Sequence, residues 1–305
     1  MLDMNRFTVS ILGAGCLWGF MGLFTRHLND LGFDSPGALI VRCGLACILF
    51  GITLLIRDRH LFRIRLRDLW CFLGAGICSL LFFTYCYFQC IRMTSLSMAA
   101  VLLYTAPSMV MVISLFVFRE KLTPRKVMAL ILAFAGCCLV SGIGGGEVNT
   151  LGVIFGLCSG LGYALYSIFA RLALNRGYDS RTINFYAMLI ATAGACVIWG
   201  GAEPVRLMCS SWEALLWSMA TGVISCYLPY LLYTYGLTGT ETGKAAVMAS
   251  TEPVVATLIG IFVYREPLSI LSALGVLLVL AAIAALNLSG KLPHSLKHSK
   301  SKSES

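Results

Sequence analysis

The chain has 305 residues, of which 58% are hydrophobic and only 12% are charged, and its mean hydropathy is +0.85. Soluble domains average about 45–50% apolar and about 25% charged residues, so a soluble globule of this size could not bury so much apolar surface. The formal net charge of +9 therefore does not indicate nucleic acid, and the position of the basic residues relative to a bilayer matters instead.

Ten apolar runs follow one another along the chain, and a helix of roughly 20 residues crosses the hydrocarbon of a bilayer. Barrel strands would alternate apolar and polar side chains, which these runs do not. We therefore predict an all-α polytopic membrane protein with ten transmembrane helices. The runs lie near residues 7–25, 37–56, 69–91, 96–118, 127–143, 151–173, 183–202, 214–237, 243–263 and 269–289.

Lysine and arginine residues are distributed unequally between the two ends of these runs. Seventeen lie on the side of the loops after the second, fourth and sixth runs, and four lie on the other side (Arg26, Arg92, Arg206 and Arg265). Because basic loops stay in the cytoplasm, we expect both termini there, in a multi-pass protein of the plasma or inner membrane.

The cysteines and histidines do not indicate a cofactor. Twelve of the thirteen cysteines lie inside apolar runs, where they act as small apolar side chains. The histidines at positions 294 and 298 lie in a basic tail, residues 291–305, that we expect to be disordered, which makes a poor metal site. We expect no metal and no cofactor.

The second half of the chain repeats the first. AAVLLYTAP at 99–107 matches AAVMASTEP at 245–253, and FVFREKLT at 116–123 matches FVYREPLS at 262–269. The offset is 146 residues in both cases, and eleven residues are identical between 97–123 and 243–269. WGFMGLFTR at 18–26 also echoes YALYSIFAR at 163–171. We therefore divide the chain into two five-helix repeats, residues 1–146 and 147–290.

Five helices are an odd number, so the second repeat enters the membrane from the opposite side. Inverted repeats are typical of secondary transporters, which bind substrate near the midplane where the halves meet. Two near-equivalent halves can exchange conformations and so provide alternating access.

The FREKLT and YREPLS elements, the preceding AP and EP dipeptides and the five-plus-five layout resemble the EamA-domain family of the drug/metabolite transporter superfamily. The resemblance implies ten helices with cytoplasmic termini. It also implies a central cavity lined mainly by helices 1, 3, 4, 6, 8 and 9. Members of the family move amino acids, other small metabolites or drugs, often outward.

Glu252 is the leading candidate for substrate binding. It lies about ten residues into the ninth run, roughly 15 Å deep, and a carboxylate near mid-bilayer is a functional hypothesis by default. Its repeat partner is Ala106, so the charge is not duplicated. Glu252 would bind a cationic group of the substrate or carry a coupling proton. The alternative is a hydrogen-bonded or protonated glutamate that packs a kinked helix.

Arg42 is a second charged residue within an apolar run, roughly 10 Å from the start of its helix. It could pair with an anionic substrate group or with Glu252. The alternative, which the sequence slightly favours, is that its long side chain extends to the external membrane surface.

Two prolines, Pro107 and Pro253, occupy matching mid-helix positions, where each removes a backbone hydrogen bond. We expect them to act as hinges, with a simple packing kink as the alternative. Among the many aromatic residues, Trp18 and Tyr163 are the preferred cavity residues because they are repeat equivalents. Tyr104 and Gln89 are further substrate-binding candidates. Each aromatic side chain could instead serve packing or anchor the protein at the interface.

Arg119–Glu120 and Arg265–Glu266 are expected to be ion pairs that cap or latch helix ends. The chain has no nucleotide-binding or hydrolase motif, so transport would depend on gradients. We therefore expect a secondary transporter that acts as an exporter, with small molecules, lipid and protons as partners. An integral-membrane enzyme and a non-transporting sensor or scaffold remain alternatives.

Overall fold

In the computed structural model the described residues are 2–141, 149–265 and 269–287, and every regular element among them is helical. This confirms the all-α class. Eight helices are long and apolar enough to span a membrane, and residues Ile270–Leu286 form a shorter apolar helix. The full count of ten spans stays a prediction. The tail, 291–305, and Glu266 lie outside the described residues.

Several of the eight spans consist of two or three consecutive elements. In chain order they are α1 (Leu2–Gly19) with α2 (Met21–Asp30), α3 (Ser35–Arg57), α4 (Leu69–Leu73) with η3 (Gly74–Leu81) and α5 (Phe82–Met93), α6 (Leu96–Leu103) with α7 (Ala106–Val117), α9 (Thr150–Leu174), α10 (Ser180–Trp199), α12 (Trp212–Ala220) with η4 (Thr221–Tyr227) and α13 (Leu228–Leu237), and α14 (Thr242–Ala249) with α15 (Glu252–Tyr264).

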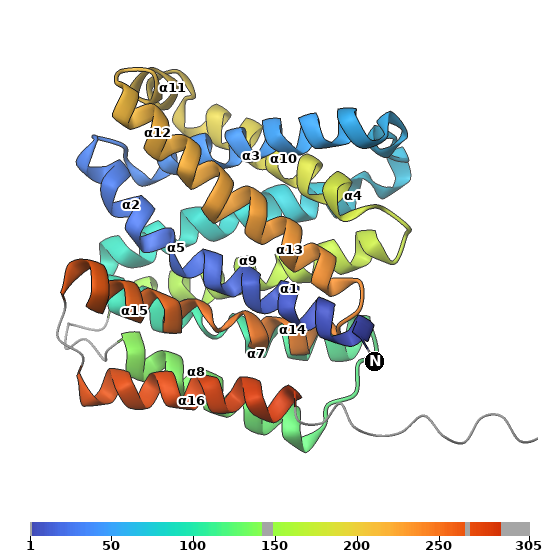
Figure 1. Ribbon diagram of the computed structural model, residues 1–305, viewed down its shortest axis with the longest axis vertical. Helices are drawn as coiled ribbons and strands as arrows, with labels where there is room; N and C mark the ends of the chain where they lie inside the picture. The colour runs from blue at the N-terminus through green and yellow to red at the C-terminus, as the bar shows by residue number, and fades with distance from the viewer. Residues whose placement is uncertain (1, 142–148, 266–268, 288–305) are drawn as a thin grey trace, which may run out of the picture.

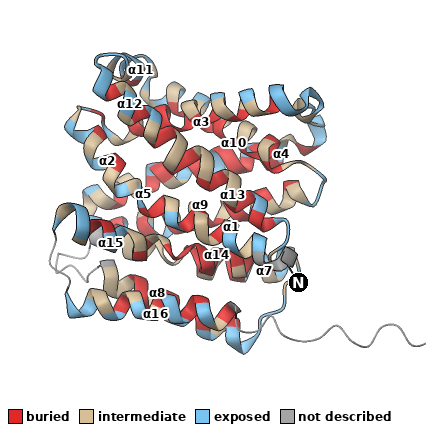
Figure 2. Ribbon diagram, in the orientation of Figure 1, coloured by how far each residue is buried: buried red, intermediate tan, exposed pale blue. Residues whose placement is uncertain are grey.

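The remaining helices lie at the periphery or in the loops. They are η1 (Arg59–Phe62), η2 (Leu66–Asp68), α8 (Pro124–Ser141), α11 (Ala202–Met208) and α16 (Ile270–Asn287). Figure 1 shows α8 and α16 side by side along one edge of the bundle, and the two helices pack against each other. At the opposite edge α3 packs against α10, while α1 and α9 run through the middle. Buried residues occur on α3, α9, α10, α13 and α14 alike (Figure 2).

Helix interruptions occur at matching places in the two halves. The π-helical segments η3 and η4 interrupt the third and eighth runs, and such wide turns often mark functional positions. Breaks also separate α6 from α7 at Tyr104–Thr105 and α14 from α15 at Ser250–Thr251. These two breaks are 146 residues apart, which is the offset of the sequence repeat.

The two Arg-Glu elements lie at opposite ends of the bundle. Glu120 accepts a hydrogen bond from the backbone N–H of Thr242, where α14 begins, whereas Arg265 follows the far end of α15. Arg119 and Arg265 both have a left-handed backbone, with φ of 53° and 55°. A repeat in the same orientation would place both arginines at one end, and the inverted two-repeat arrangement stays a prediction.

Glycines allow two close helix crossings at the broken spans. A Cβ on Gly15 of α1 would collide with Thr251 Oγ1 and would lie 2.8 Å from the carbonyl oxygen of Ala249. A Cβ on Gly160 of α9 would lie 2.7 Å from Thr105 Oγ1 and 3.1 Å from the carbonyl oxygen of Leu102. Each crossing therefore holds a central helix of one half against the broken span of the other half.

We expect Gly15→Ala to lower the free energy of unfolding by about 1–3 kcal/mol, because the new methyl group would meet backbone that cannot move aside. Thermal unfolding in detergent measures the effect. Gly22→Ala in α2 is the matched control, since a Cβ there meets nothing within 4 Å and should be neutral or slightly stabilising. Equal melting temperatures for the two variants would contradict the close crossing.

Candidate functional site

A cavity lies in the middle of the bundle, lined by the first, third, fourth, sixth, eighth and ninth runs, the set that the resemblance implied. The side chains nearly fill the cavity, and the space that remains holds only about one water molecule. An organic substrate therefore fits only after the helices move apart. The ring-bearing and hydroxyl-bearing side chains of the wall are Trp18, Ser79, Phe83, Tyr163, Tyr166, Ser167, Tyr230 and Tyr233.

Trp18 is the centre of the aromatic wall. Its ring centroid lies 5.3 Å from that of Tyr230, 5.4 Å from that of Tyr233 and 6.3 Å from that of Tyr163. The Tyr163 and Tyr230 rings meet it at steep angles of 64° and 79°. The structure thus brings Trp18 and Tyr163 together at the cavity, as predicted. Ring faces in such a cluster attract cations.

Glu252 is the first residue of α15, directly after the Ser250–Thr251 break. Its carboxylate has the Tyr163 side chain as a hydrogen-bond partner, and Tyr87 and Tyr104 lie close enough to interact with its charge. Glu252 is not itself in the cavity wall, but Tyr163, which is in the wall, is a partner of its carboxylate. Tyr163 therefore links the carboxylate to the cavity.

Arg42 lies inside the bundle, near enough to Glu252 for their charges to interact. Only 7% of the residue is exposed, and its Nη1 donates to Met21 Sδ at 3.2 Å. Tyr230, which lines the cavity, is an electrostatic neighbour of the guanidinium. The sequence slightly favoured the interpretation that the Arg42 side chain extends to the membrane surface. That interpretation is therefore wrong. Packing of α3 against α10 and η4 holds the side chain inside the bundle.

The predicted candidates Tyr104 and Gln89 do not line the cavity. Tyr104 ends α6 at the break and packs with Cys137 and Val254, within reach of the Glu252 charge. Gln89 lies half-buried on α5. Tyr104 therefore belongs to the surroundings of Glu252, whereas the geometry gives Gln89 no place at the cavity.

The two prolines lie in the first turn after each break rather than inside a continuous helix. Pro107 is the second residue of α7 and Pro253 is the second residue of α15, and both are buried. Proline is tolerated there because the N–H of the first turn has no intrahelical partner. Pro107 also lines the cavity, so a movement at the first break would change its shape. The hinge role stays a prediction.

A buried polar network next to the cavity was not among the predicted site residues. Asn184 on α10 is fully buried, and its Oδ1 accepts hydrogen bonds from the Tyr166 hydroxyl and from Thr234 Oγ1. Its Nδ2 donates to the carbonyl oxygen of Tyr230 at 3.1 Å. The sequence feature that could have indicated this network is an amide side chain, Asn184, near the start of an apolar run. The network fixes Tyr166 and Tyr230 in the wall of the cavity.

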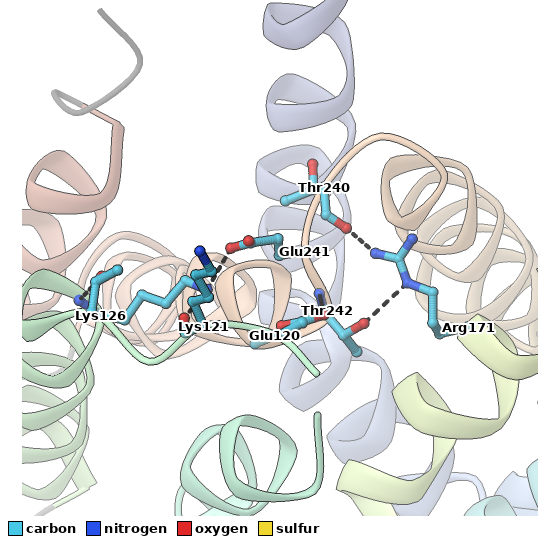
Figure 3. A network of polar contacts seen from close by, with 9 residues as sticks. Glu120, Lys121, Lys126, Arg171, Thr240, Glu241 and Thr242 are labelled. Carbon is cyan, nitrogen blue, oxygen red and sulfur yellow. Dashed lines mark hydrogen bonds and ion pairs between the residues drawn. The ribbon is translucent and has the colours of Figure 1, made fainter. Parts of the chain in front are cut away.

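A network of polar contacts joins the two halves at one end of the bundle (Figure 3). Glu120 Oε1 accepts from the N–H of Thr242 at 2.6 Å, and Oε2 accepts from the N–H of Gly243 at 3.1 Å. The carboxylate thereby caps the positive N-terminus of α14. No ion pair between Glu120 and Arg119 is found in the part of the chain that the structure describes, so that prediction is wrong.

Two cations extend this network on either side of Glu120. Arg171, at the end of α9, donates from Nε to Thr242 Oγ1 at 3.0 Å and from Nη2 to the carbonyl oxygen of Thr240. Lys126 of α8 donates to the carbonyl oxygen of Lys121 and forms an ion pair with Glu241 (Figure 3). We call Glu120, Lys126, Arg171 and residues 240–243 the latch. Its contacts connect α8, α9 and the start of α14 at one end of the bundle.

A family model described as the EamA-like transporter family matches residues 7–142 and 150–288. An uncharacterized transporter from Archaeoglobus fulgidus is 30% identical over 197 residues, which cover 65% of this chain and 69% of that protein. A second transporter from the same organism is 26% identical and covers 87% of this chain and 93% of its own length.

More distant similarities point the same way. The uncharacterized transporter YxxF of Bacillus subtilis is 24% identical over 275 residues, covering 88% of this chain and 85% of YxxF. A solved crystal structure with 17% identity superposes with a TM-score of 0.77 and covers 93% of this chain and 97% of that chain. At this identity the structural likeness shows a shared fold alone.

Proposed function

Because the chain belongs to the EamA-like transporter family, we propose that it is a secondary transporter for small metabolites that carry an ammonium group, such as amino acids or amphipathic cations. It works by alternating access across the plasma or inner membrane, in the outward direction, with both termini in the cytoplasm. Proton exchange on Glu252 couples the movement to a gradient.

The observation that carries this proposal is the aromatic cavity with a carboxylate behind one of its rings. An ammonium group is attracted to the faces of tryptophan and tyrosine rings, and a carboxylate supplies the balancing charge. Neither group alone selects a cation in the membrane interior, where an uncompensated charge is costly. Together they suit a substrate with one positive group and an apolar or zwitterionic remainder.

Alternating access is supported by three features that occur once in each half. These are the π-helical segment, the broken span with its proline, and the glycine crossing against the other half. The closed cavity and the latch describe a state in which substrate is excluded from one end. The same contacts must separate when that end opens.

The proposal is tested with purified protein in sealed vesicles that carry an imposed proton gradient. Labelled amino acids and organic cations are offered singly, and we expect gradient-driven movement of at least one without chemical change. Conversion of the solute would instead indicate a membrane enzyme. Binding that raises the melting temperature without any flux would indicate a sensor or scaffold, because a ligand of the folded state stabilises it by mass action.

We expect Trp18→Ala to weaken binding of the transported cation about tenfold, since it removes a ring face that contributes about 0.5–2 kcal/mol to holding a cation. The dissociation constant from thermal shifts measures this effect. Trp212→Ala is the matched control, because Trp212 is 74% exposed at the start of α12 and lies outside the cavity wall. Equal losses in the two variants would place the binding site elsewhere.

A further inference from the structure

A second site lies at one end of the bundle, where the span Leu66–Met93 begins. It is an open cleft lined by Arg65, Arg67, Asp68, Trp70 and Arg176. None of these residues lines the central cavity or belongs to the latch. The cleft is therefore independent of the transport site and needs its own explanation.

The cleft is a built structure rather than a set of mobile side chains. Asp68 is 5% exposed, and its Oδ1 lies 3.1 Å from Arg176 Nε while its Oδ2 accepts from the Tyr178 hydroxyl at 2.8 Å. The same hydroxyl accepts from the backbone N–H of Arg65 at 3.0 Å. The Arg176 guanidinium also lies over the Trp70 ring, 4.8 Å from its centroid. These contacts hold the loop against the end of α9.

The charges of the cleft are not balanced. Arg176 neutralises Asp68, the only acidic residue in the lining. Arg65 and Arg67 are both exposed, and neither forms an ion pair within the described ranges. Two arginines with guanidinium donors to spare form a site for an oxyanion, and a phosphate matches their forked geometry best.

The apolar side chains around the arginines identify the source of that phosphate. Leu66, between Arg65 and Arg67, is 85% exposed, and Trp70 one turn further is 43% exposed. Both residues lie at the start of an apolar span, where tryptophan commonly marks the membrane interface. A soluble phosphate compound would leave these side chains in water, whereas a lipid provides a charged headgroup and an acyl region side by side.

We propose that this cleft binds the headgroup of an anionic phospholipid, with Arg65 and Arg67 on the phosphate and with Leu66 and Trp70 against the acyl chains. A basic pocket at the end of a transmembrane bundle is the form such sites take. The four proposed lipid contacts all lie on residues 65–70, a segment that the Asp68–Arg176 ion pair already holds at the end of α9.

The experiment measures binding of phosphatidylglycerol to the full-length protein in detergent by native mass spectrometry, with phosphatidylcholine as the zwitterionic reference. We expect preferential retention of phosphatidylglycerol. The double variant Arg65→Gln/Arg67→Gln should bind it about thirtyfold more weakly, since each basic residue near the headgroups contributes about a fivefold factor. Both residues are exposed, so the variant is expected to fold.

Two further variants separate the possible outcomes. Arg206→Gln is the control, because Arg206 is an equally exposed arginine on α11 and should leave lipid binding unchanged. Leu66→Ser should weaken phosphatidylglycerol binding but not the binding of inorganic phosphate. The proposal is overturned if the double variant retains full lipid preference, or if phosphate binds as well as the lipid and Leu66→Ser has no effect.

Discussion

Glu252→Gln is expected to reduce kcat/KM for an ammonium-bearing substrate by about 30- to 100-fold. The substitution keeps the shape of the side chain but removes the charge, and a hydrogen bond to a charged group in a protein is worth about 1.5–3 kcal/mol. It also removes the group proposed to carry the proton, so flux should no longer respond to a proton gradient. Initial rates of uptake into vesicles, measured with and without the gradient, report both effects.

The matched control for this variant is Glu203→Gln. Glu203 lies on α11, where its side chain is 67% exposed and that of its partner Arg206 is 83% exposed. Exposed ion pairs of this kind contribute little, so its transport should stay within about twofold of the unmodified protein. Unchanged rate and unchanged gradient dependence in Glu252→Gln would remove both proposed roles and leave the glutamate as a packing residue of the broken span.

Glu120→Ala is expected to shift the protein toward a state that is open at the latch. The change removes the carboxylate that accepts from the N–H groups of Thr242 and Gly243. Loss of a helix cap costs about 0.5–2 kcal/mol, which corresponds to a shift of up to about thirtyfold between closed and open populations. Transport should slow as well, because an unbalanced equilibrium leaves one state too sparsely populated.

The shift can be measured by thiol labelling at Ser167→Cys, a position in the cavity wall one turn before Arg171. The exposed native cysteines Cys16, Cys78 and Cys209 are first replaced. A polar maleimide applied from the latch side should react about tenfold faster when Glu120 is alanine.

A control for the latch is available at another helix terminus. Glu213→Ala alters an exposed glutamate in the first turn of α12, which caps no element of the other half. It should leave the labelling rate unchanged. An equal rate in the Glu120 and Glu213 variants would show that the latch contacts do not control access to the cavity.

Several parts of the site follow from residue patterns in the chain. The offset of 146 residues predicts paired breaks near Pro107 and Pro253, and the structure has an interruption before each proline. The repeat equivalence of Trp18 and Tyr163 favours both as cavity residues, and both line the cavity, whereas their role in substrate binding stays a prediction. Such features can be read from the sequence because a backbone break depends on local residues, and because equivalent positions in two copies meet where the copies face each other.

Other parts depend on contacts between segments that are distant in the chain. Glu120 binds the start of α14, which is more than a hundred residues away in the chain. The sequence instead predicted an ion pair with the adjacent Arg119. Asn184 has its partners on α9 and α13, and no local pattern names them. Gln89 has a polar side chain that could bind substrate, but its position on α5 keeps it out of the cavity wall.

By itself, the sequence determined that the chain forms apolar helices in a membrane, because only lipid can solvate so many apolar side chains. It also located the repeat and the charged residues within the spans. Only the tertiary structure decided which side chains meet: that Arg42 is enclosed, that the cavity residue Tyr163 is a partner of Glu252, and that Glu120 joins the two halves. The physical reason is that helix formation and membrane insertion depend on local composition, whereas a helix's rotation about its axis is set by the neighbours against which it packs.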